Sequence, residues 1–162
     1  MALDEYLFSR VVNYFKKNKR TSTEIAQRTV YLNDIKSRLA IVSTALSGIK
    51  IEIYPAEREG GYKDDNFFLP PSFYLFPSAE ANYSFYLYRV FYLSIQKELN
   101  LNWNKNEEQG QELSQQKAAE TASQVLNELF RHYPVLHKLH SSFETYLSET
   151  TEGPAKPEYF WL

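Results

Sequence analysis

The sequence contains no cysteine, which excludes both a disulfide framework and thiolate ligation of a metal. It also has no apolar run approaching the roughly 20 residues that span a bilayer. Its first residues, 1–6, lack the basic segment and following apolar segment of a secretory signal. We therefore expect a cytoplasmic protein without a membrane span.

The familiar catalytic patterns are missing as well, including a serine nucleophile elbow, a dinucleotide signature and a zinc-protease helix. Gly60-Gly61 fits a turn better than a glycine-rich phosphate loop. Asp64, Asp65 and Asn66 lack the alternating acids and the distal glutamate of a calcium loop. We therefore predict a protein that is not an enzyme and that has neither a cofactor nor a metal site.

Three histidines, His132, His137 and His140, lie within nine residues of each other. Imidazole is a common zinc or copper ligand, but Pro134 separates His132 from the helix expected to carry the other two. We interpret His137 and His140 as a surface pair. The alternative is a small metal- or anion-binding enzyme that uses the three histidines, Arg89 and the loop acids.

The length of 162 residues suits one domain with one core, which we place at 1–149, followed by a tail at 150–162 that contains proline and glycine. The net charge is −2, but residues 1–50 carry nine Lys or Arg against four Asp or Glu. The basic run at 16–20 could suggest phosphate binding. We assign it to the end of a helix, because no nucleic-acid motif accompanies it.

Helical periodicity dominates the chain, and the pattern predicts a mainly α fold in which about five helices form an irregular bundle. The first is expected near 4–17. The second should start at the capping-box pattern around Ser22 and continue as one heptad-spaced helix to Leu46, where Ser47-Gly48 ends it. A fourth is expected over about 113–131, and a fifth should begin at Pro134.

The third helix should follow Ser78 as its N-cap and extend to about Leu99. Its residues are apolar or aromatic almost all round, which predicts the central helix of the bundle. Arg89 lies in the middle of this segment, where an unpaired charge would be costly. We expect a carboxylate partner for it, with Glu52 as the first candidate and Glu57 or Glu59 as the others.

A short segment departs from the helical pattern at 49–69. Ile49, Ile51 and Ile53 alternate with polar residues as in a strand that is buried on one face. A second short strand at 67–69 should pair with it, giving one small two-stranded β-hairpin. The charged loop between the two strands is expected to lie at the surface.

The segments IEIYPAE (51–57), FLP (68–70) and YLYRV (86–90) resemble the N-terminal region of the nitric oxide reductase activation protein family (NorD), relatives of the Rubisco activators called CbbO. The resemblance covers roughly residues 25–100. Members of that family carry a von Willebrand factor A domain and act with a MoxR-type AAA+ ATPase to mature or remodel a metalloenzyme. This chain has no Asp-x-Ser-x-Ser motif, so the metal-dependent adhesion of that domain does not carry over.

The resemblance implies a helical domain whose role is protein–protein contact, with a MoxR-type ATPase or a client metalloenzyme as the partner. A charged loop rimmed by aromatic residues suits specific docking. The residues that we expect in the docking loop are Tyr54, Glu57, Arg58, Glu59, Tyr62, Lys63, Asp64 and Asp65.

Overall fold

The computed structural model describes residues 22–57, 60–101 and 111–150. The helix expected near 4–17 and nearly all of the tail lie outside these ranges. Five helical segments are present in the part of the chain described: residues 22–28, α2 (Leu32–Ser47), α3 (Ala79–Glu98), α4 (Gln111–His132) and α5 (Val135–Thr150). The strands are β1 (Val30–Tyr31), β2 (Glu52–Pro55), β3 (Gly61–Lys63), β4 (Asn66–Leu69) and β5 (Ser72–Phe73). The predicted mainly helical class is confirmed.

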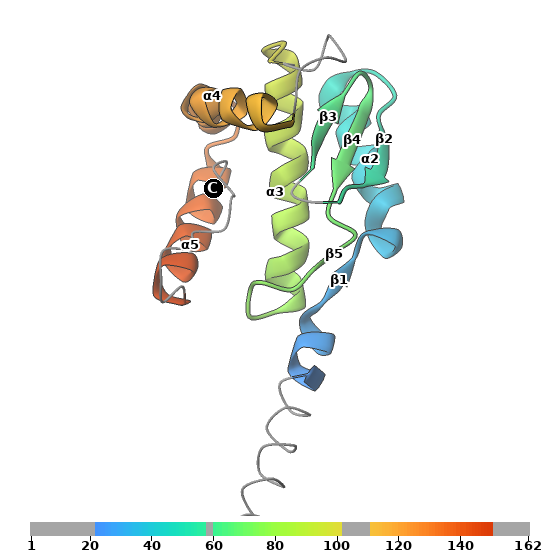
Figure 1. Ribbon diagram of the computed structural model, residues 1–162, viewed down its shortest axis with the longest axis vertical. Helices are drawn as coiled ribbons and strands as arrows, with labels where there is room; N and C mark the ends of the chain where they lie inside the picture. Colours follow the sequence, from blue (N-terminus) through green and yellow to red (C-terminus); the bar gives the residue numbers. More distant parts are fainter. Residues whose placement is uncertain (1–21, 58–59, 102–110, 151–162) are drawn as a thin grey trace, which may run out of the picture.

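Helix α3 lies at the centre of the molecule, as the sequence predicts (Figure 1). The small strands and α2 cover one side of it, and α4 and α5 lie on the other side. The Ser78 side chain accepts a hydrogen bond from the Ala81 amide at 3.1 Å, which confirms the predicted N-cap. Ten residues of α3 are buried, so the helix is enclosed on nearly every side.

The aromatic side chains of α3 form the middle of the core. Phe85 stacks on Phe73 with ring centroids 3.9 Å apart, and Phe76 stacks on Phe143 of α5 at 4.4 Å. Val125 and Leu129 of α4 are fully buried against the same cluster. The high aromatic content of the chain therefore builds one continuous core across α3, α5 and the segment before α3.

The single helix predicted from Ser22 to Leu46 is wrong in one respect, because the chain leaves the helix between residues 28 and 32. Val30–Tyr31 forms β1, which pairs antiparallel with β5. The Leu32 amide then donates to the Pro71 carbonyl at 2.9 Å. Consecutive Thr29 and Val30 are β-branched and Tyr31 is aromatic, which favours extended backbone where a partner strand is present. The end of α2 follows the prediction, since Gly48 adopts φ 70° as its C-cap.

The β structure is larger than the predicted two-stranded hairpin. Strands β2, β4 and β3 form a mixed sheet in that order, in which β2 runs parallel to β4 and β3 runs antiparallel to β4. The expected direct hairpin between β2 and β4 is therefore wrong. The hairpin is β3–β4, and it turns at Asp64, whose φ is 53°. The predicted alternation is confirmed for Ile51 and Ile53, which are buried, and for Glu52, which is exposed. It is wrong for Ile49, which is 43% exposed and precedes β2.

Within the residues that the structure describes, no helix is long and apolar enough to cross a membrane.

Candidate docking face

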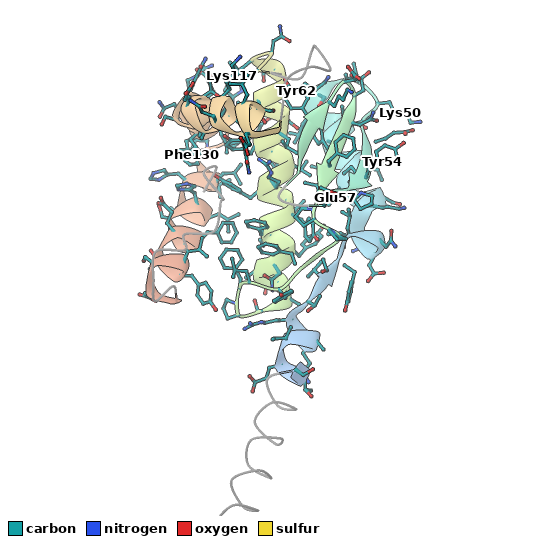
Figure 2. The ribbon with its side chains drawn as sticks, in the orientation of Figure 1. Lys50, Tyr54, Glu57, Tyr62, Lys117 and Phe130 are labelled. Carbon is teal, nitrogen blue, oxygen red and sulfur yellow. The ribbon has the colours of Figure 1, made fainter. Side chains whose placement is uncertain are left out.

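One face of the mixed sheet is turned away from the core, and we call it the outer sheet face. It is defined by Glu52 and Tyr54 of β2, Lys63 of β3, and Asn66 and Phe68 of β4. The register places Tyr54 opposite Phe68 and Glu52 opposite Asn66, and paired residues point to the same side of a sheet. Figure 2 shows Tyr54 on the side of the sheet away from α4.

An aromatic pair lies at the centre of the outer sheet face. The rings of Tyr54 and Phe68 are 6.0 Å apart at an interplanar angle of 30°. Tyr54 is 43% exposed, and Phe68 is half-buried although it belongs to the central strand. Its neighbour on β3 is Gly61, which has no side chain to cover it. The face therefore presents apolar ring surface to its surroundings.

Charged groups adjoin this pair on β2 and just before it. Lys50 lies 2.8 Å from one carboxylate oxygen of Glu52, and the Tyr54 hydroxyl donates to the other at 2.5 Å. The hydrogen bond from Lys50 and the further one from Tyr54 hold the pKa of Glu52 below its usual value. The carboxylate thus stays ionised and orients the Tyr54 ring beside Phe68.

Glu52 is therefore not the partner of Arg89, and this prediction is wrong. Alternation along β2 directs Glu52 to the outer sheet face, whereas Arg89 is buried on the α3 side with 3% of its surface exposed. The Arg89 guanidinium donates to the Gly60 carbonyl oxygen at 3.3 Å and lies 5.3 Å from the centroid of the Tyr92 ring. Glu57 is exposed, and Glu59 lies outside the described residues.

Gly60 is a position where the fold requires glycine. Its φ is +78°, and a Cβ built there would lie 1.9 Å from the carbonyl oxygen of Phe68. Gly61 differs, since its φ is not in the left-handed region and a Cβ would meet nothing within 4 Å. The predicted turn function of the glycine pair therefore belongs to Gly60, which lets the chain approach β4 closely.

Lys97 holds the other end of β3, and the sequence analysis missed it. Its ammonium group donates to the Asp64 carbonyl at 2.7 Å and to the Asp65 carboxylate at 2.9 Å. It also lies 5.8 Å from the centroid of the Tyr62 ring. A lysine in the last turn of a helix is common, so nothing in the sequence connected it to the loop acids.

The eight residues predicted for the docking loop therefore have different places. Tyr54 and Lys63 lie on the outer sheet face, and Glu57 is exposed just after β2. Tyr62 lies on the opposite side of the sheet, where burial raises its pKa to about 12. Asp64 and Asp65 form the turn that Lys97 binds. The other two, Arg58 and Glu59, lie outside the described residues.

The histidines do not converge on one point. His132 lies 3.5 Å from Glu128 at the end of α4, whereas the His137 ring lies edge-on to Phe130 at 4.9 Å. His140 is buried at 7% exposure, so the prediction of a surface pair is wrong for this residue. In the ranges that the structure describes, no group of three histidine, aspartate or glutamate side chains could hold a metal ion.

No family model matches the chain, and neither a curated protein nor a solved structure matches it.

Proposed function

We propose that this chain is a non-enzymatic protein-interaction domain that binds its partner through the outer sheet face. The observation that carries the proposal is the Tyr54–Phe68 ring pair at the centre of that face, in which Tyr54 is exposed and Phe68 is half-buried. Binding energy in protein interfaces is concentrated in a few residues, with tyrosine among the most frequent. The charges of Lys50, Glu52 and Lys63 provide the polar rim that typically surrounds such anchors.

The way the face is supported favours specific docking. Arg89 binds the chain just before β3, and Lys97 binds the chain just after it. The hydrogen bonds of Glu52 fix the orientation of Tyr54 before any partner arrives. A surface that is ordered in advance loses less conformational entropy on binding.

The partner that we propose follows from the resemblance to the NorD family. It is a MoxR-type AAA+ ATPase or the metalloenzyme on which that ATPase acts, in the cytoplasm. Segment 51–57, which carries part of the resemblance, contains β2 and Tyr54. Segment 51–57, which resembles the NorD family, thus contributes Glu52 and Tyr54 to the proposed docking face.

The test is a binding measurement between the purified full chain and a purified MoxR-type ATPase, by biolayer interferometry. Tyr54→Ala should weaken binding by tenfold or more, on the order expected for an interface anchor. Ile41→Ala is the matched control, because Ile41 is an apolar residue of α2 that is 70% exposed and lies off the sheet. It should bind like the wild type.

Failure of the wild-type chain to bind both the ATPase and its client enzyme would contradict the proposed partner. Equal affinities of the Tyr54→Ala and Ile41→Ala variants would contradict the proposed face. Stoichiometric zinc, calcium or iron in the purified protein would favour the alternative, a metal-binding enzyme.

A further inference from the structure

Helix α5 is held against α3 mainly by aromatic side chains. Phe143 stacks on Phe76 at 4.4 Å and meets the edges of Phe85 and Tyr88, each at 5.8 Å. Tyr146 adds a further ring contact to Phe76 at 5.5 Å. Such contacts are strong while water is excluded, and they replace only part of the hydration that a charge placed among them would lose.

His140 is the polar residue that α5 buries at this contact. Its ring lies 5.2 Å from Phe130 of α4 and 6.0 Å from Tyr88 of α3. The Nε2 atom is fully buried, and it has no hydrogen-bond partner among the residues that the structure describes. A neutral imidazole tolerates this position, because one of its nitrogens need not donate a proton.

The titratable groups around His140 offer little support for a positive charge. The Nδ1 atom lies 3.4 Å from a carboxylate oxygen of Glu144, whose side chain is largely exposed. His137, one turn earlier on α5, opposes the charge. From α3 the facing titratable group is Tyr88, which burial keeps neutral, and from α4 the facing ring is the uncharged Phe130.

We propose that α5 is a pH-sensitive cover over the aromatic core, and that protonation of His140 releases it from α3. Protonation makes both ring nitrogens donors, so an N–H at Nε2 would be buried without an acceptor. When α5 is released, that N–H can donate a hydrogen bond to water. Release also exposes the rings of Phe76, Phe85, Tyr88 and Phe143, which would form an acid-induced apolar surface.

The direction of the pH dependence follows from the two states. Burial is the main reason that the pKa of His140 lies below its ordinary value in the docked state. In the released state the ring is hydrated, with an ordinary pKa of about 6.5. The docked state is therefore fully favoured above about pH 6.5 and loses stability as the pH falls from there toward the lowered pKa.

The experiment measures a distance between α5 and the rest of the molecule. Because the chain has no cysteine, Ser37→Cys on α2 and Ser141→Cys on α5 provide two exposed sites for spin labels. Pulsed electron paramagnetic resonance should give one distance near neutral pH. At about pH 5, where an ordinary histidine is mostly protonated, a second and longer distance should appear.

Two further variants in the labelled background make the test decisive. His140→Phe should keep one distance at both pH values, whereas His132→Gln, the control on the exposed end of α4, should respond as the wild type does. If His140→Phe does not fold, Glu144→Gln serves instead. This substitution removes the negative charge that faces the protonated ring in the docked state, so it should enlarge the long-distance population at acid pH.

An unchanged wild-type distance between neutral pH and about pH 5 would overturn the proposal, as would an acid population that persists in His140→Phe or does not grow in Glu144→Gln. Circular dichroism at the same pH values separates release from unfolding. Loss of the helical signal of the whole chain at acid pH would also overturn it, since α5 would then not be released as a unit.

Discussion

The guanidinium of Arg89 donates to the main-chain carbonyl of Gly60, 3.3 Å away, and so connects the middle of the central helix to the first residue before β3. The acceptor is a backbone atom at a position with φ +78°, which an L-residue rarely adopts. The sheet is thus connected to α3 at a point where the backbone of Gly60 also approaches Phe68 closely.

Substitution of the three described glycines should have graded effects on stability. Gly60→Ala should lower the free energy of unfolding by on the order of 3 kcal/mol, because it combines a left-handed φ with a clash against the Phe68 carbonyl. Gly48→Ala, with φ +70° and open space, should cost about 1 kcal/mol. Gly61→Ala should change stability by less than about 0.5 kcal/mol. Urea unfolding of the three variants checks this order, and equal losses at Gly60 and Gly61 would contradict the geometry.

Buried Tyr86 and half-buried Tyr62 should respond differently to removal of the hydroxyl. The Tyr86 hydroxyl donates to the Pro70 carbonyl at 2.6 Å, so Tyr86→Phe should lower the free energy of unfolding by about 1 kcal/mol or more. The Tyr62 hydroxyl is buried and has no hydrogen-bond partner among the described residues. Tyr62→Phe should therefore be neutral or stabilising in chemical denaturation near neutral pH. A loss at Tyr62 equal to that at Tyr86 would be the contrary result.

Tyr62 gives a further prediction, on the stability of the protein at alkaline pH. Burial raises the pKa of Tyr62 from 10.0 to about 12 in the folded protein. Since the folded state favours the neutral phenol, this contribution to stability is complete below about pH 10 and is lost as the pH rises through 12. Wild-type stability should therefore fall more steeply over that range than the stability of Tyr62→Phe. Parallel pH profiles from urea unfolding would show that Tyr62 is not the group responsible.

The helices were predictable because their signals are local. The segment after Ser78 is apolar all round and begins with a capping residue, and both features depend on neighbours in the sequence. The break at Val30–Tyr31 depends instead on pairing with β5. In the sequence, β5 comes only after α2 and the three strands of the mixed sheet. The heptad spacing from Ile25 to Leu32 passes over residues 29–31, so it carries no sign of the break, and Leu32 is buried in the structure.

The candidate site was predictable in part, for a similar reason. Alternation identified Glu52 as exposed and Ile53 as buried, but it carries no information on strand order. The partner of Arg89 was sought among carboxylates, since a buried charge usually requires one. The structure shows the carbonyl of Gly60 as one acceptor for Arg89, and any residue type could have supplied that atom, while the candidate Glu59 lies outside the described residues.

Removal of the Lys97 ammonium should loosen the β3–β4 turn. Lys97→Met keeps an apolar side chain of similar length but deletes the ammonium group near Tyr62 and its hydrogen bonds to Asp64 and Asp65, at a cost of about 1 kcal/mol. Amide hydrogen exchange should accelerate between residues 61 and 68 more than in α4. Lys63→Met is the matched control, because Lys63 is exposed on the same hairpin. Equal exchange in the two variants would show that the hairpin does not depend on Lys97.

The attachment of α5 should depend on Phe143 more than on the other apolar residues of that helix. Phe143 is 3% exposed and contacts Phe76, Phe85 and Tyr88, so Phe143→Ala should lower the free energy of unfolding by about 3–5 kcal/mol.

Val135 provides the contrast within the same helix, because it is 73% exposed and its truncation should change stability by less than about 0.5 kcal/mol. Hydrogen exchange distinguishes local from global effects, since the aromatic contact joins α5 to α3. If Phe143→Ala accelerates exchange in α5 while the mixed sheet keeps its protection, α5 can detach without unfolding the rest. Equal acceleration in both would mean that α5 and the sheet open as one cooperative unit.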